Sequence, residues 1–283
     1  MVRVVTDSTS YVPRKLREEL GILVVSLNVS FETEAFREEE IDNIKFYERM
    51  AQSEKLPTSS PPAPFDFYDV YESIVAKGDS VVGIFISSEM SKTYSAALMA
   101  KSMILSNYPD AVIEIIDSRY NCMAMGLGVV AAARAAREGK SAEEVIEAAH
   151  RVMKRMRFLF VPLTLDYLKK GGRIGGAAAL LGQIFQIRPV LTIVDGKIAV
   201  HGKVRTQTKA LQNIVDDLIK DAGKKGVGEV VVHHINCKAE GYNLAQSIED
   251  RVSAKPFVVS IGPVIGLHVG PGTVGIAYYT DRD

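Results

Sequence analysis

The most unusual segment of this chain carries a histidine among glycines and prolines near the C-terminus. Residues 262–272 read GPVIGLHVGPG, with His268 as the only titratable side chain. Glycine permits tight turns and close approach to a ligand, and proline fixes φ and removes a donor. The segment therefore predicts a loop around His268. An imidazole there could act as a catalytic base, although a lone histidine among apolar residues is more often a structural hydrogen-bonding group.

Hydroxyl side chains recur where expected strands give way to helices. The clusters are Asp7-Ser8-Thr9-Ser10, Ser87-Ser88-Glu89-Met90-Ser91 and Asp117-Ser118. In a parallel α/β sheet such junctions share the carboxyl edge, where ligands bind, but Ser, Thr and Asp are also the ordinary helix N-caps. Ser88 stands out because the helix that follows it offers N–H groups and a dipole that favour an anion.

A second hydroxyl-bearing loop and three basic residues could extend an anion site. Prolines restrain the loop at 57–62, where Thr58 and Ser59 could donate to an oxyanion. Arg173 follows a glycine pair, and its rigid guanidinium suits a carboxylate or phosphate. Lys203 and Arg205 share a face if their strand continues. Taken singly, such residues are ordinary connectors and solvated surface groups.

Two enzymatic interpretations remain open. Ser88 as nucleophile and His268 as base would make a stand-alone acyl hydrolase or transferase, although the chain has no Gly-x-Ser-x-Gly elbow. The glycine-rich turn at 171–176 would suit a phosphoryl-transfer enzyme, but no strand precedes it and there is no Walker loop. The remaining histidines and the two cysteines, Cys122 and Cys237, lack metal-ligand spacing, so we expect no metal site and no disulfide.

The elements expected to position these residues change character near residue 157. Before it, apolar runs at 2–6, 22–27, 80–86 and 111–116 alternate with helical patterns, which predicts a parallel sheet wrapped by helices. After it, strands at 189–194 and 197–200 flank Asp195-Gly196, a hairpin turn. The sequence predicts an α/β fold with two domains: an α/β domain at 1–157 and an α+β domain with a mixed or antiparallel sheet at 158–283.

Composition disfavours several function classes. The 283 residues include 34 basic and 34 acidic side chains and no basic block, unlike a nucleic-acid-binding protein. No stretch approaches the length of a membrane span, and the start does not resemble a secretory signal. Two distant cysteines fit a reducing compartment. We expect a cytoplasmic protein without an integral membrane segment.

Taken in order, these motifs resemble the DegV family of bacterial fatty-acid-binding proteins along nearly the whole chain. Met90 and Lys92 depart from the leucine and glycine of the family's Ser-Ser-x-Leu-Ser-Gly-Thr-Tyr segment, and Lys92 leaves the geometry near Ser88 open. The matching segments are 7–10, 58–61, 86–94, 117–118, 125–128, 170–174, 203–205 and 266–272.

The resemblance implies a lipid-binding protein, without enzymatic activity of its own, that holds one long-chain fatty acid between two domains. Thr58 and Ser88 would hold the carboxylate near His268, and a protonated His268 would strengthen that hold. The fatty acid would be the ligand, with no further cofactor. A separate ATP-dependent fatty acid kinase would then make an acyl phosphate for phospholipid synthesis. The headgroup region or the surface for that partner would involve Arg173, Arg205, Ser59, Gly266 and Gly270.

Overall fold

The chain forms two compact units in the computed structural model, which describes residues 1–283 except 33, 184–186 and 253. The first unit comprises Met1–Glu40 and Ser59–Lys154, and the second comprises Ile41–Thr58 and Arg155–Asp283. The domain division at residue 157 stays a prediction from the sequence pattern. That pattern carries no signal for the membership of residues 41–58 in the second unit.

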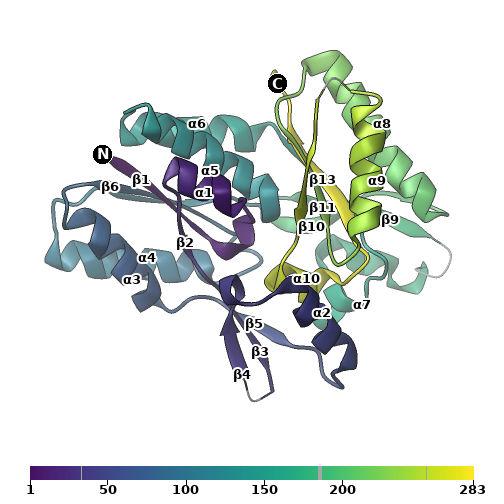
Figure 1. The fold of residues 1–283 in the computed structure, drawn as a ribbon, viewed down its shortest axis with the longest axis horizontal. Helices are drawn as coiled ribbons and strands as arrows, with labels where there is room; N and C mark the ends of the chain where they lie inside the picture. Colours follow the sequence, from purple (N-terminus) through teal and green to yellow (C-terminus); the bar gives the residue numbers. More distant parts are fainter. Residues whose placement is uncertain (33, 184–186, 253) are drawn as a thin grey trace. The chain divides into compact units, whose positions relative to one another are not determined.

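The first unit alternates strands with helices, as the sequence predicted (Figure 1). Its elements, with η marking 3₁₀ helices, are β1 (Val2–Asp7), η1 (Ser8–Ser10), α1 (Arg14–Leu20), β2 (Leu23–Val25), β3 (Asn28–Phe31), β4 (Glu34–Arg37), η2 (Glu38–Glu40), β5 (Thr58–Ser60), α3 (Pro64–Val75), β6 (Ser80–Phe85), α4 (Thr93–Asn107), β7 (Ile113–Asp117), α5 (Cys122–Arg137) and α6 (Ala142–Lys154).

Four of these strands form a parallel sheet in the order β2-β1-β6-β7. Figure 1 shows α3 and α4 on one side of this sheet and α5 and α6 on the other. Buried residues of α3 and α4, such as Phe67 and Ile104, pack against Val5 of β1 and Val81 of β6. Both faces are thus covered by helices, as expected for a parallel sheet.

Because these strands run in one direction, the hydroxyl clusters share one edge of the sheet. Asp7 ends β1, Ser87 and Ser88 follow β6, and Asp117 ends β7. The register pairs Phe85 with Asp117, which puts the ends of β6 and β7 side by side. This arrangement confirms the placement of the clusters at the carboxyl edge.

A separate three-stranded sheet, in the order β4-β3-β5, was not predicted from the sequence. The antiparallel pair β3 and β4 runs from Asn28 opposite Arg37 to Phe31 opposite Glu34. Strands of three or four residues are too short to show a clear period-two pattern, so they could not be predicted from the pattern of apolar residues.

The second unit has a six-stranded mixed sheet, in the order β10-β9-β8-β13-β11-β12. β11 and β12 are parallel and the other neighbours are antiparallel, as predicted for the C-terminal half. The elements are α2 (Asn43–Gln52), β8 (Met156–Val161), α7 (Asp166–Lys170), η3 (Gly175–Gln183), β9 (Arg188–Val194), β10 (Lys197–Val204), α8 (Gln207–Lys225), β11 (Val230–His234), α9 (Lys238–Glu249), β12 (Phe257–Ser260), α10 (Pro263–Val269) and β13 (Val274–Tyr279).

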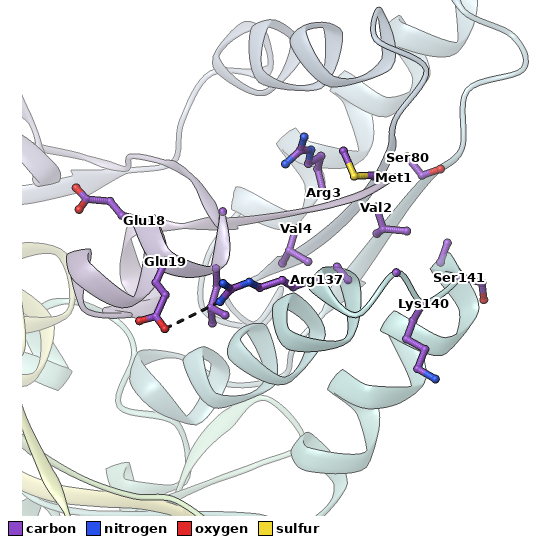
Figure 2. Close-up of a pocket in the computed structure, with 15 residues that line it drawn as sticks. Met1, Val2, Arg3, Val4, Glu18, Glu19, Ser80, Arg137, Lys140 and Ser141 are labelled. Carbon is purple, nitrogen blue, oxygen red and sulfur yellow. Dashed lines mark ion pairs between the residues drawn. The ribbon is translucent and has the colours of Figure 1, made fainter.

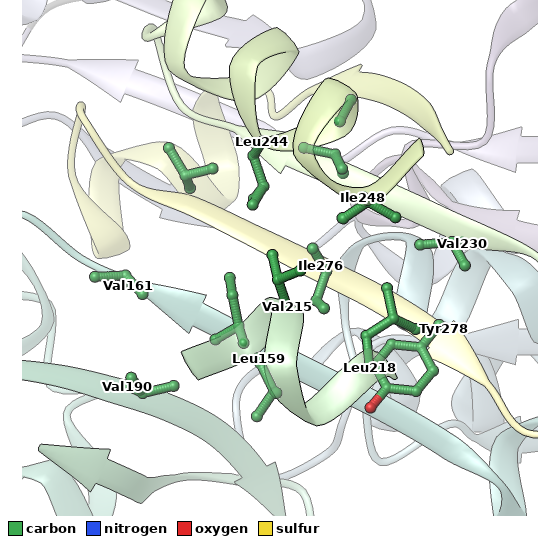
Figure 3. Packing of buried hydrophobic residues seen from close by; sticks show 14 of the residues in the cluster. Leu159, Val161, Val190, Val215, Leu218, Val230, Leu244, Ile248, Ile276 and Tyr278 are labelled. Carbon is green, nitrogen blue, oxygen red and sulfur yellow. The ribbon is translucent and has the colours of Figure 1, made fainter. Parts of the chain in front are cut away.

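Helices α8 and α9 pack on one face of this sheet. Figure 3 shows Val215 and Leu218 of α8 and Leu244 of α9 against Leu159 and Ile276 of the strands. The predicted hairpin between β9 and β10 is confirmed: Asp195 and Gly196 have φ values of 50° and 79°, the left-handed conformations that a tight hairpin turn requires.

The glycine- and proline-rich segment is where the sequence prediction was wrong. Residues 263–269 form α10, not a loop. Pro263 occupies the first helical turn, where its missing N–H costs nothing. A turn forms only after the end of α10, where Gly270 and Gly272 have φ values of 94° and 80°. Burial of apolar side chains such as Leu267 offsets the poor helix propensity of the segment.

Among the described residues, no helix is both long and apolar enough to cross a membrane.

Candidate functional site

At the carboxyl edge of the first unit, Asp7 is committed to internal contacts. Its carboxylate accepts hydrogen bonds from the backbone N–H of Thr9 at 2.9 Å and of Ile86 at 2.8 Å, and from the Thr9 hydroxyl. Burial raises the pKa of Asp7 to about 6, although these hydrogen bonds act in the opposite direction. Asp7 thus fastens the end of β1 to the segment that follows β6.

Ser8 of the same cluster also faces protein groups. Its hydroxyl donates to buried Glu38 at 2.5 Å and accepts the backbone N–H of Leu27 at 3.1 Å. The other carboxylate oxygen of Glu38 accepts the Tyr11 hydroxyl at 2.7 Å. For the Asp7–Ser8 cluster, the interpretation as cap and turn residues is therefore the one that the geometry favours.

Ser88 differs from that cluster because its side chain is exposed. Its hydroxyl donates to Oδ2 of Asp117 over 2.6 Å, and its backbone N–H donates to Oδ1 over 3.2 Å. Ser88 lies in a turn, and the helix that follows begins only at Thr93, with Lys92 as its N-cap. The expected placement at a helix N-terminus was therefore wrong, because a turn separates Ser88 from α4.

In the second unit, His268 lies in the last turn of α10 next to the turn after α7. Burial, together with a smaller effect of the nearby charge of Arg173, lowers the pKa of His268 to about 4. The imidazole is thus neutral at pH 7, which corrects the expectation of a protonated His268. The packing is tight: a Cβ on Gly171 would collide with Nδ1 of His268.

The remaining predicted residues divide between the two units. The boundary between the units falls within β5: exposed Thr58, its first residue, belongs to the second unit, whereas half-buried Ser59, like Ser88, belongs to the first. Arg173 is exposed, and its guanidinium donates to the carbonyl of Gly171 over 2.7 Å. Arg205 is exposed in the bend between β10 and α8. The second unit thus brings Arg173 and His268 together.

Gly266 and Gly270 lie against two tyrosines that were not among the predicted site residues. A Cβ on Gly266 would collide with the hydroxyl of Tyr47 in α2, which donates to the carbonyls of Ile261 and Gly262 over 3.0 Å each. A Cβ on Gly270 would meet the ring of Tyr167 in α7. Glycine at these positions indicates that another group packs closely against the backbone, but the sequence does not identify that group. Their role at a headgroup stays a prediction.

Two surface pockets lie away from these residues. Figure 2 shows one of about 560 Å³, lined near the starts of β1 and β6 by Met1, Arg3 and Ser80, with Arg137 paired to Glu19 at 4.0 Å. The other, of about 550 Å³, lies between α8 and α9. Neither is lined by a predicted site residue.

Within the described part of the chain, no group of three or more His, Cys, Asp or Glu side chains could hold a metal ion.

Comparison with known proteins decides the family. A family model described as an uncharacterised protein of the DegV family matches residues 1–281. The chain belongs to the DegV family. A DegV domain-containing protein of Clostridium acetobutylicum is 50% identical over 282 residues, covering 100% of this chain and 99% of the relative. The resemblance drawn from the ordered motifs is confirmed.

Solved structures of two bacterial proteins share the fold over nearly the full length. A stearic-acid-binding protein from Eubacterium ventriosum has a TM-score of 0.91 and 31% identity, with 99% of both chains covered. DegV of Bacillus subtilis, described as a fatty-acid-binding protein, has a TM-score of 0.90 and 32% identity with the same coverage. The α/β fold class predicted from the sequence is confirmed.

Proposed function

We propose that this DegV protein binds one long-chain fatty acid and presents its carboxyl group to a separate ATP-dependent fatty acid kinase in the cytoplasm. The observation that carries the binding step is the similarity, over 99% of both chains, to a protein described as binding stearic acid. Each buried methylene contributes about 0.8 kcal/mol, so a long acyl chain supplies on the order of 10 kcal/mol before the costs of binding.

The head group would be held by Thr58, Ser88 and His268. Burying a carboxyl group is costly unless donors and acceptors meet it. Thr58 and Ser88 are exposed hydroxyl residues, and neutral His268 has one ring N–H to donate and one ring nitrogen to accept with. This proposal takes Ser88 from the first unit and the other two residues from the second.

Mass spectrometry of an organic extract of the purified protein tests the binding step. We expect a fatty acid in the extract, and saturable binding of that acid when the delipidated protein is titrated. Ser88→Ala and Thr58→Val should each weaken binding, whereas Ser106→Ala, an exposed serine in α4, is the matched control. An extract without fatty acid together with no binding to delipidated protein would refute the proposal.

The kinase step is the finer part of the proposal and needs its own test. Exposed Arg173 and Arg205 would serve the headgroup region or docking of the kinase. The assay is ATP-dependent formation of acyl phosphate by a purified fatty acid kinase, with this protein as carrier of the lipid. Arg173→Ala with Arg205→Ala should slow acyl phosphate formation and leave lipid retention intact. Arg14→Ala, an exposed arginine of α1, is the control. Unchanged rates in the double variant would contradict the docking role.

A further inference from the structure

Asp117 is the hydrogen-bond partner of the Ser88 hydroxyl. The distance of 2.6 Å to Oδ2 is typical of a charge-assisted bond. The opposite oxygen, Oδ1, accepts the backbone N–H of Ser88 at 3.2 Å and that of Arg119 at 3.0 Å. Asp117 therefore fixes both the side chain and the backbone of the residue proposed to meet the ligand.

This bond decides what Ser88 can offer to a ligand. A hydroxyl has one proton to donate and two lone pairs with which to accept. While Ser88 donates to Asp117, only its lone pairs are left for a fatty acid. A fatty acid carboxylate in contact with the Ser88 hydroxyl would also lie close to the carboxylate of Asp117, with only that hydroxyl between them. Two carboxylates in one site repel each other, which favours retention of one proton between them.

Two further charged groups act on this pair. The guanidinium of Arg119, in the loop after β7, lies 3.6 Å from Asp117 and 3.8 Å from Glu89, which is in the turn after β6. The positive charge of Arg119 would offset part of the repulsion between Asp117 and a bound carboxylate. Its side chain is 44% exposed, however, and Glu89 interacts with the same cation, so solvent and Glu89 weaken that effect.

We infer that Asp117 and the carboxyl group of the bound fatty acid share one proton across the hydroxyl of Ser88. The inference rests on the proposed function and adds the chemical form in which the ligand binds: a fatty acid together with a proton, rather than a second anion. Asp117 is then a positioning residue for Ser88. A free fatty acid is ionised at neutral pH, so binding takes up a proton from solvent.

Proton uptake can be measured by isothermal titration calorimetry of delipidated protein with laurate. The titrations use buffers of different ionisation enthalpy at one pH near neutrality and one ionic strength. The slope of the observed enthalpy against the buffer enthalpy gives the number of protons bound. We expect about one proton for the wild type, none for Asp117→Asn, and a clear reduction for Ser88→Ala, which removes the bridge. Asp110→Asn, an exposed change before the start of β7, should match the wild type.

The outcomes separate this inference from the proposed function. Laurate that binds to the wild type without proton uptake leaves the function standing and overturns the inference. Uptake that persists in folded Asp117→Asn also overturns it. Ser88→Ala keeps the test decisive if Asp117→Asn does not fold, because uptake equal to the wild type would place the proton elsewhere. If neither laurate nor a long-chain acid such as stearate binds to the wild type, both the proposed function and the inference fail.

Discussion

Replacing His268 by glutamine should remove part of the acid sensitivity of the fold. The pKa of His268 falls from 6.5 to about 4 in the folded protein, chiefly because its imidazole is buried. The unfolded chain therefore binds the proton first as the pH falls, so the stability contributed by neutral His268 is complete above pH 6.5 and is lost toward pH 4. With these two pKa values, the loss between pH 8 and pH 5 is about 2 kcal/mol.

The measurement is urea denaturation at pH 8 and pH 5, for the wild type and for His268→Gln. The quantity of interest is the difference in unfolding free energy between the two pH values. It should be smaller by about 2 kcal/mol in His268→Gln. Protonation of His233 in the unfolded chain also lowers the unfolding free energy over this interval, but that contribution is the same in both proteins and cancels in the comparison. His150→Gln, an exposed change on α6, tests whether removal of any histidine has this effect. If His268→Gln keeps the full wild-type pH difference, the burial argument is refuted.

Three further substitutions test the packing and buried polar groups. His233→Leu should raise the unfolding free energy at pH 7 by about 1 kcal/mol, because within the described chain neither ring nitrogen of this buried histidine has a hydrogen-bond partner; a loss of stability in urea would contradict this. Gly266→Ala should lower the unfolding free energy by about 1–3 kcal/mol, because the added Cβ collides with Tyr47. Gly223→Ala in α8, where a Cβ meets open space, should leave the unfolding free energy unchanged or raise it. The pKa of Asp7 rises to about 6 on folding, so the unfolding free energy of the wild type should fall by about 2 kcal/mol from pH 4.5 to pH 7.5 through ionisation of this residue. Asp7→Asn should remove that decline, and an unchanged profile in urea titrations would refute the assignment.

The sequence was most informative where local pattern and topology agree. Alternating strands and helices in the first half require a parallel sheet, and that alone puts the ends of β1, β6 and β7 on one edge. Ser88 and Asp117 could therefore be predicted to lie at the same edge of the sheet. Their hydrogen bond could not be predicted, because it depends on the register of β6 against β7 and on the turn that carries Ser88.

The errors came from long-range contacts that override local preference. Glycine and proline at 262–272 favour a loop, yet α10 forms because the hydroxyl of Tyr47 fits over Gly266 and the helix buries its apolar side chains. Tyr47 is far from this segment in sequence, and it also binds the carbonyl of Gly262. This contact connects residues 41–58 to the rest of the second unit. Neither fact has a local sequence signal.

The charge state of these residues argues against recognition of the head group by a simple ion pair. His268 was expected to supply a positive charge, but burial keeps it neutral at pH 7. Ser88 was expected to donate to a carboxylate, but its proton already belongs to the bond with Asp117. A neutral imidazole and a hydroxyl with only its lone pairs left suit a protonated carboxyl group better than an anion. Arg173 and Arg205 are exposed, so their charges are available to the kinase partner that we propose.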